Sequence, residues 1–274
     1  MDAVTLGPLV VPTAALLVIG GIVLANLLAE LFRRRGLDPG PILWKMLLAG
    51  FAAARAVFVL RHHDLFAQQP WTALDFRDGG FDSTAGLLVA CVVGAELTRR
   101  HPLLRRPLLV SSLAGIGLWL GGTLMLQAFA PPHAPLPELN VRQLDGAEIP
   151  LRAYQGKLLV INLWATWCPP CRREMPALAA MQAKRPDVAF VFVNQGESAA
   201  QVQTFLAAQG LRLDNVLLDQ AGQLGARTGS VGFPTTLFYD ARGVLRARHV
   251  GELSEASLRE KLTTLAPLDT LLDK

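Results

Sequence analysis

The stretch Trp-Ala-Thr-Trp-Cys-Pro-Pro-Cys, residues 164–171, decides the fold of the C-terminal half of this chain. It directly follows the run 158–164, which is apolar except for Asn162 and predicts a buried strand. The pattern that follows predicts a helix from about Cys168 to Gln182. A thiol at a helix N-terminus is stabilised as thiolate by unpaired backbone N–H groups and by the helix dipole. We therefore predict that Cys168 is an exposed nucleophile with a lowered pKa, and that Cys171 resolves the mixed disulfide.

Two cysteines at this spacing can also form half of a zinc site. A tetrahedral site needs two further soft ligands, and the polar half of the chain offers only His133 and His249. We therefore expect no metal at the pair. The third cysteine, Cys91, lies within an apolar run, so the odd count of three excludes a framework of structural disulfides. Cys91 is predicted to be a small buried apolar residue.

The segments around the motif alternate between strand and helix patterns, which is typical of an α/β domain. Two short extended runs flank the turn Asp145-Gly146, ahead of the motif. The elements predicted after the motif are a strand at 188–194, a helix at 198–208 that ends at Gly210, strands at 235–239 and 244–250, and a helix at 254–265. Together they predict one domain over residues 139–274.

The N-terminal half has a different composition. The chain is 51% hydrophobic with a mean hydropathy of +0.35, and the apolar residues are concentrated before residue 131. Four runs approach the roughly 20 residues that a spanning helix needs; they cover 9–32, 41–60, 84–97 and 107–130. The third run is short, but its small residues suit close helix packing. We predict a transmembrane helical domain of about four spans over 1–130 and a proline-rich linker over 131–138.

The charge pattern indicates membrane topology. The net charge is +4, but the arginine clusters at 33–35 and 99–106 flank apolar runs, and no nucleic-acid motif accompanies them. We therefore expect no nucleic-acid partner. The first run is too long for a signal peptide and is interpreted as a retained span. Positive-inside reasoning places both clusters in the cytoplasm, and so places the N-terminus and everything after Ala130 outside.

Residues 136–265 resemble the TlpA-like and ResA-like branch of the thioredoxin family. The resemblance rests on the motif 164–171, on Gly-Phe-Pro-Thr-Thr at 232–236, and on the additional strand and helix around 194–211. It implies a thioredoxin fold that reduces protein disulfides and needs no cofactor beyond the redox-active Cys168–Cys171 disulfide. It also implies that Pro234 follows a cis peptide bond and that the backbone at Phe233 pairs with an extended substrate.

Two further residues complete the predicted site. Trp167 is expected in the apolar surroundings of the disulfide, where substrate binds. Glu174, three residues after Cys171, matches an acidic position of ResA-like proteins, and the resemblance implies that it tunes the cysteines and moves protons. The alternative is a solvated helix residue paired with Arg172 or Arg173. Asn162 stands where ordinary thioredoxins have a buried carboxylate, which favours Glu174 for proton transfer. Glu197 is expected to be remote, because it is distant from the motif in sequence.

The membrane half resembles part of the prolipoprotein diacylglyceryl transferase family over about residues 53–93. Arg55, Gly79, Gly80 and Gly86 fall on matching positions, whereas Thr84 and Ala85 replace the histidine and glycine expected there. The resemblance implies a degenerate lipid-binding domain. Arg55 is interpreted either as a functional group at membrane depth or as a snorkelling side chain. The outer loop between the second and third runs carries His62, His63, Asp64, Asp75, Asp78 and Asp82, whose irregular spacing fits a solvated loop better than a metal site.

These features predict a multi-pass protein of the inner membrane whose C-terminal domain lies in the periplasm and reduces protein disulfides. A single membrane cysteine, Cys91, cannot alternate between dithiol and disulfide, so a separate transmembrane thiol reductant is expected as partner, alongside membrane lipid. The alternatives are a disulfide oxidase or isomerase with the same fold, and a lipid-handling enzyme with an accessory redox domain.

Overall fold

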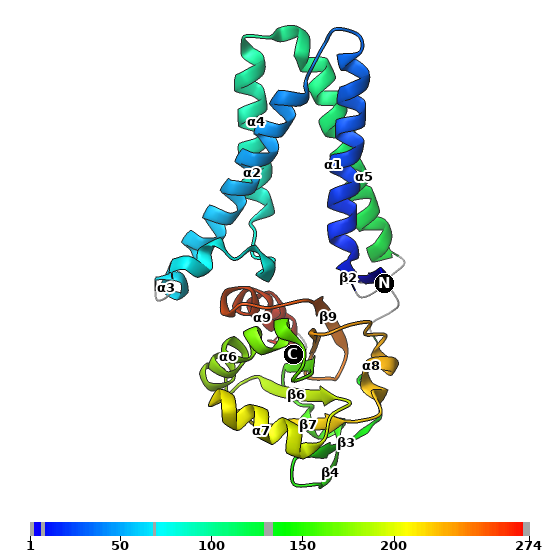
Figure 1. Ribbon diagram of the computed structural model, residues 1–274, viewed down its shortest axis with the longest axis vertical. Helices are drawn as coiled ribbons and strands as arrows, with labels where there is room; N and C mark the ends of the chain where they lie inside the picture. Colours follow the sequence, from blue (N-terminus) through cyan, green and yellow to red (C-terminus); the bar gives the residue numbers. More distant parts are fainter. Residues whose placement is uncertain (1–2, 7–8, 68–69, 129–133, 271–274) are drawn as a thin grey trace. The chain divides into compact units, whose positions relative to one another are not determined.

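The computed structural model describes residues 3–6, 9–67, 70–128 and 134–270, which divide into two compact units (Figure 1). The first is built mainly from residues 11–76 and 80–130, and the second mainly from residues 131–274.

The N-terminal half is helical after a short strand pair. Its elements are β1 (Ala3–Leu6), β2 (Leu9–Pro12), α1 (Thr13–Arg33), α2 (Gly40–Arg61), α3 (His63–Phe66), η1 (Pro70–Leu74), η2 (Phe76–Asp78), α4 (Ser83–Arg99), η3 (Pro102–Leu104) and α5 (Arg105–Ala128). The first apolar run was expected to be helical from Leu9. Instead, residues 9–12 pair with β1, and the helix begins at Thr13.

Three segments in the described part of this half are long and apolar enough to cross a membrane. They are Thr13–Arg33, Gly40–Arg61 and Pro102–Leu126, with mean hydropathies of 2.3, 1.7 and 1.7. The helix α4 has 17 residues, so it rises only about 26 Å against a hydrocarbon core of about 30 Å. The expected total of about four spans therefore stays a prediction.

The long helices pack as two pairs, α1 along α5 and α2 along α4 (Figure 1). Glycines allow the backbones to approach closely in both pairs. A Cβ atom on Gly21 would lie 2.7 Å from the carbonyl oxygen of Gly115, and one on Gly50 would lie 2.9 Å from that of Gly86. Because contacts this short exclude any side chain, both pairs depend on small residues at the crossing. Cys91 is exposed on α4 rather than buried as expected, because the face that α4 buries carries Gly86, Gly94 and Thr98.

Arg55 is buried in α2 and holds the loop that leads to α4. Its guanidinium donates to four backbone carbonyl oxygens, those of Thr72, Ala73, Asp75 and Gly80, at 2.7–3.1 Å. Four phenylalanine rings surround it with centroids 5.5–5.8 Å from its central carbon; they belong to Phe58, Phe66, Phe76 and Phe81. Arg55 therefore does not snorkel toward water. It gives the loop carbonyls a charged donor inside a ring of aromatic side chains.

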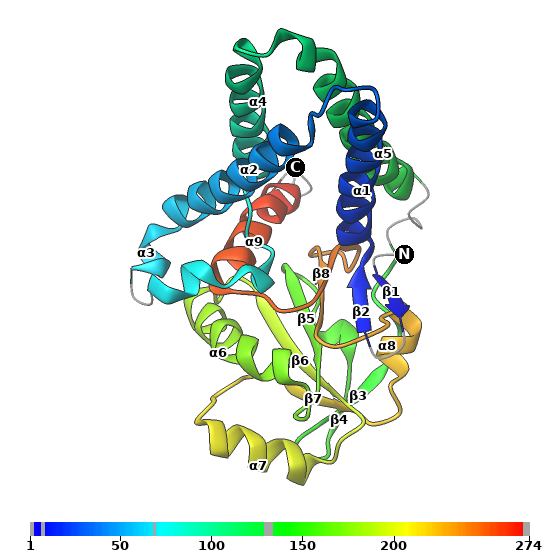
Figure 2. The ribbon, with the colours of Figure 1, turned by 45° about the horizontal axis from the view of Figure 1, so that its top comes forward.

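The C-terminal domain is built on one seven-stranded sheet with the order β4-β3-β7-β6-β5-β8-β9 (Figure 2). The neighbours β5–β6 and β6–β7 are parallel, and the other pairs are antiparallel. The strands are β3 (Asn140–Gln143), β4 (Glu148–Pro150), β5 (Leu159–Trp164), β6 (Ala189–Gln195), β7 (Val216–Asp219), β8 (Thr235–Tyr239) and β9 (Leu245–Val250). The helices are η4 (Leu151–Tyr154), α6 (Pro169–Lys184), α7 (Ala199–Gln209), α8 (Gln223–Thr228) and α9 (Glu255–Thr270).

Both faces of this sheet are buried. Alternate residues of β5 enter two separate cores: Val160 and Trp164 pack with α6, α7 and α9, whereas Leu159, Ile161 and Leu163 pack with η4 and α8. A strand covered on both faces has no solvent-facing side, which explains why the run that precedes the cysteines is apolar except for Asn162.

The predicted α/β alternation is confirmed, with element bounds displaced by one to a few residues. The helix α7 begins after the N-cap Ser198 and closes at Gly210 in the left-handed conformation, as its sequence predicts. The expectation lacked β7 and α8, which have four and six residues. Runs this short carry little periodicity, and only pairing with β3 and β6 defines β7.

We predict that Arg55→Gln destabilises the membrane unit by about 3 kcal/mol, because several buried carbonyls would lose a charged donor. The free energy of unfolding in detergent, together with protease sensitivity of the loop between α2 and α4, measures the effect. Arg61→Gln is the matched control, because its side chain is 65% exposed in an ion pair with Asp82; it should cost at most about 1 kcal/mol. Equal losses in the two variants would show that Arg55 does not hold the loop.

Candidate functional site

The cysteine pair lies where β5 gives way to α6. Cys168 is the N-cap of α6, and Pro169 and Pro170 occupy the first helical positions, where a backbone N–H has no helical partner. Cys168 and Cys171 form a disulfide with Cα atoms 5.3 Å apart. The backbone N–H of Cys171 also points at the sulfur of Cys168, at 3.3 Å. After reduction this donor and the helix dipole would both stabilise a Cys168 thiolate.

The exposure of the site differs from the expectation. Cys168 was predicted to be exposed, but in the oxidised protein it is only 3% exposed and Cys171 is fully buried. The bonded sulfur of Cys168 is turned toward the backbone of Cys171, and both residues belong to the larger core cluster. Trp167, the residue before the pair, is 66% exposed instead. It therefore offers an apolar surface beside the disulfide.

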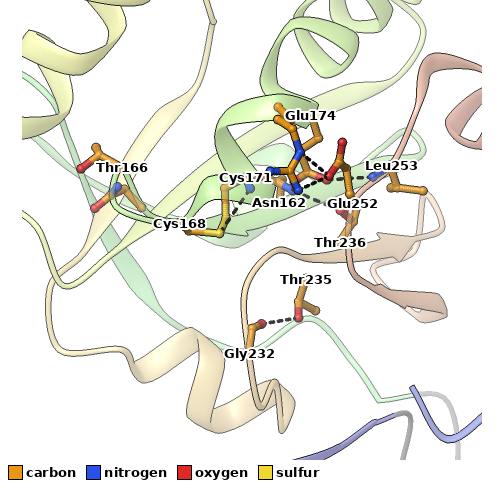
Figure 3. The surroundings of a disulfide bond; sticks show 12 residues. Asn162, Thr166, Cys168, Cys171, Glu174, Gly232, Thr235, Thr236, Glu252 and Leu253 are labelled. Atoms are coloured by element: carbon orange, nitrogen blue, oxygen red, sulfur yellow. Dashed lines mark hydrogen bonds and ion pairs between the residues drawn. A yellow bond between two sulfur atoms is a disulfide. The ribbon is translucent and has the colours of Figure 1, made fainter. Parts of the chain in front are cut away.

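The loop that leads into β8 lies beside the cysteine motif. The peptide bond between Phe233 and Pro234 is cis, as the family resemblance implies. The rings of Phe233 and Trp167 meet edge to face with centroids 6.0 Å apart, which brings the loop beside the cysteine motif. The hydroxyl of Thr235 donates to the carbonyl oxygen of Gly232 at 2.6 Å and closes the loop (Figure 3).

Glu174 is buried behind the disulfide, with 1% of its surface exposed. Its Oε1 accepts from the Asn162 amide at 2.8 Å, and its Oε2 accepts from the Leu253 backbone N–H at 3.0 Å (Figure 3). The same Asn162 nitrogen lies 3.1 Å from the Thr236 hydroxyl oxygen. The alternative of a solvated residue paired with a neighbouring arginine is thus wrong, because Arg173 pairs with Glu252 instead.

Burial decides the protonation of Glu174. Loss of hydration raises the pKa of its carboxyl to about 8, with a smaller upward contribution from the Glu252 carboxylate. The hydrogen bonds from Asn162 and Leu253 act in the opposite direction and lower the pKa. A carboxyl that titrates near neutral pH, one helical turn from Cys171, is suited to exchange a proton with that thiol.

Glu197 belongs to the site, although the sequence placed it remotely. It is buried in the loop after β6 and accepts from the Thr166 backbone N–H and the Asn194 amide, both at 2.7 Å, and from the Thr166 hydroxyl. Glu197 therefore holds the turn between β5 and Cys168 in place. The sequence carried one indication of this role. Glu197 comes just after a predicted strand, and the carboxyl ends of parallel strands meet at one edge of a sheet.

In the described part of the N-terminal helical unit, Arg55 and Asp82 are engaged in structural contacts. The Arg55 guanidinium is engaged by loop carbonyls, and Asp82 caps α4 through the Ala85 N–H while pairing with Arg61. Across the described residues of the chain, no three histidine, cysteine or acidic side chains gather as metal ligands would.

The raised pKa of Glu174 predicts a pH-dependent stability. The folded pKa of about 8 exceeds the ordinary value of 4.5, so between these limits the folded domain holds a proton that the unfolded chain releases. The contribution of Glu174 to the free energy of unfolding should therefore fall as pH rises from about 4.5 to about 8, by at most about 1.4 kcal/mol per pH unit. Burial lowers the pKa of His249 from 6.5 to about 4, which contributes in the opposite direction below about pH 6.5. Urea titrations of the oxidised protein across this range measure the slope.

Glu174→Gln should remove the falling contribution and make the slope more positive, because glutamine does not titrate. Glu148→Gln is the control, since the Glu148 side chain is 61% exposed, and it should leave the slope unchanged. An identical slope in wild type and Glu174→Gln would contradict the assignment.

Comparisons with known proteins match the C-terminal half of the chain. A family model described as Redoxin matches residues 131–263. The chain is 34% identical over 130 residues to the thioredoxin-like protein YneN of Bacillus subtilis, covering 46% of this chain and 75% of that protein. It is 33% identical over 141 residues to the thiol:disulfide interchange protein DsbE of Pseudomonas fluorescens, covering 51% and 77%.

A third relative is the thiol-disulfide oxidoreductase ResA of Halalkalibacterium halodurans, which is 30% identical over 165 residues, covering 58% of this chain and 93% of that protein. The expected thioredoxin-like α/β fold of the C-terminal half is thereby confirmed. With its CxxC disulfide at the start of α6, the chain belongs to the thioredoxin-like thiol–disulfide oxidoreductases of the ResA and DsbE type.

Proposed function

We propose that this protein is a membrane-anchored reductase of protein disulfides. The observation that carries the proposal is the pairing of a disulfide at the start of α6 with a buried carboxyl, Glu174, that can hold or release a proton near neutral pH. Once the disulfide is reduced, Cys168 can act as the nucleophile, and Glu174 can accept the proton of the Cys171 thiol.

The reaction has two exchange steps. The Cys168 thiolate attacks one sulfur of the substrate disulfide, a mixed disulfide forms, and the other substrate sulfur leaves as a thiolate. Glu174 then accepts the proton of the Cys171 thiol, and the new thiolate attacks the Cys168 sulfur and expels the second substrate thiolate. The substrate gains two electrons, and the Cys168–Cys171 pair loses two and closes its disulfide.

The substrate is an extended polypeptide in this proposal. The exposed Trp167 ring supplies an apolar contact, and the backbone at Phe233, immediately before the cis-proline Pro234, supplies hydrogen bonds to an extended chain. Both groups lie beside the disulfide rather than around a deep pocket, which suits protein disulfides better than a small molecule.

The membrane half anchors the enzyme. Three helices of sufficient length and hydropathy support the anchor, and the arginine clusters that flank the apolar runs favour an inner-membrane protein with its C-terminal domain in the periplasm. Contacts with membrane lipid follow from the anchor. The diacylglyceryl-transferase-like interpretation has less support, because the Arg55 donors that would meet a lipid phosphate are engaged by carbonyls.

We predict that Cys168→Ser abolishes disulfide reduction, whereas Cys171→Ser accumulates mixed disulfides, because only the first step survives in the second variant. Turnover of a model protein disulfide and non-reducing electrophoresis measure the two outcomes. Residual turnover in Cys168→Ser equal to that of wild type would refute Cys168 as nucleophile. A reduction potential of the pair near the roughly −120 mV of a strong oxidant would favour the oxidase alternative instead.

We also predict that Cys91→Ala leaves activity unchanged, because one thiol cannot carry two electrons across the bilayer. The pair would instead be reduced by a separate transmembrane thiol protein. The purified full-length protein in liposomes, with a thioredoxin system on the cytoplasmic side, tests this. Sustained disulfide reduction on the opposite side, lost in Cys91→Ala, would overturn the prediction.

A further inference from the structure

An ion pair between two chain segments lies next to the buried carboxyl. The Arg173 guanidinium donates to Glu252 Oε2 from two nitrogens, Nε at 2.8 Å and Nη2 at 2.7 Å. Arg173 directly precedes Glu174 on α6, and Glu252 directly precedes Leu253 in the turn between β9 and α9. The pair therefore joins the same two segments that the hydrogen bond from Leu253 to Glu174 joins, one residue away (Figure 3).

The Glu252 side chain is 14% exposed, so its charge is only partly screened, whereas Arg173 is 42% exposed. Glu174 is hydrogen-bonded by Asn162 on β5, whose nitrogen also contacts Thr236 on β8. The charged and titratable groups on the neighbouring segments are Arg173 on α6, Glu252 in the turn, His249 on β9, whose Nε2 lies 3.3 Å from the Glu252 carbonyl oxygen, and Lys261 on α9, which acts on His249. Glu252 is the anion that acts on the Glu174 carboxyl through space.

We propose that Arg173 and Glu252 are a pair of positioning residues for Glu174, and that their opposite charges decide when its carboxyl holds a proton. The proposal rests on the proton-transfer role given to Glu174 above. Glu252 favours the protonated carboxyl by repulsion, and Arg173 offsets part of that repulsion because two of its nitrogens contact Glu252 Oε2. The balance between the two charges sets the pH at which Glu174 can accept the proton of Cys171.

A purely mechanical role makes a different prediction from this electrostatic one. If the ion pair only holds the turn in place, loss of either partner withdraws the Leu253 N–H and raises the pKa of Glu174 in both cases. If the charges act as proposed, the two losses have opposite signs. Removing the Arg173 charge unmasks Glu252 and raises the pKa, whereas removing the Glu252 charge leaves Arg173 and lowers it.

The test is an infrared titration of the full-length oxidised protein in detergent, in which the band of the protonated carboxyl is followed against pH. Its loss in Glu174→Gln assigns the band. We expect the midpoint to rise in Arg173→Gln and to fall in Glu252→Gln, each by roughly half a pH unit. Arg173→Lys, which keeps the charge, should restore the wild-type midpoint.

The ion pair between Lys184 and Glu255 provides the matched control. It also joins α6 to the start of α9, but at the far end of α6 from the cysteines. Lys184→Gln and Glu255→Gln should leave the midpoint unchanged. Shifts of the same sign in Arg173→Gln and Glu252→Gln, or no shift in either, would overturn the proposal. Because the titration uses oxidised protein without substrate, its failure is distinguishable from a failure of the reductase activity, which turnover measures separately.

Discussion

The burial of one carboxyl group constrains most of the redox site. A carboxylate removed from water is costly unless other groups solvate it, and Glu174 obtains its partners from segments far apart in sequence. Asn162 comes from the central strand β5, and Leu253 from the turn before α9. These contacts require α6 to lie flat on the sheet and α9 to close against α6. The same packing carries Cys168 and Cys171 to the C-terminal edge of β5.

A second buried carboxylate at the site, that of Glu197, has a structural role. Glu197 takes its hydrogen bonds from Thr166 and Asn194, and so ties the turn before Cys168 to the end of β6. Glu174 lies on the helix side of the disulfide and Glu197 on the strand side. One carboxyl is placed for proton exchange with the cysteines, and the other fixes the backbone on which they are presented.

Local features of the site could be predicted from the sequence, whereas its long-range contacts could not. The strand before the cysteines, the helix after them and the cis bond at Pro234 follow from contiguous patterns and from the family motif. The burial of Glu174 and the role of Glu197 depend on partners up to 79 and 31 residues away, which no local pattern reveals. Cys168 was predicted to be exposed and is buried, because the position of a thiol at a helix N-terminus does not determine how its sulfur packs in a disulfide. Arg55 was placed at membrane depth, but its carbonyl partners lie in a loop without periodicity.

The nested pairing of the membrane helices constrains the order in which the chain can assemble. A ribosome releases the N-terminus first, so α2 meets α4 after a short stretch of synthesis. The helix α1 has to wait for α5, the last helix before the C-terminal domain. Until then the close approach of Gly21 to Gly115 cannot form. A chain interrupted before residue 105 would leave the side of α1 around Gly21 without α5, the helix that packs against it here.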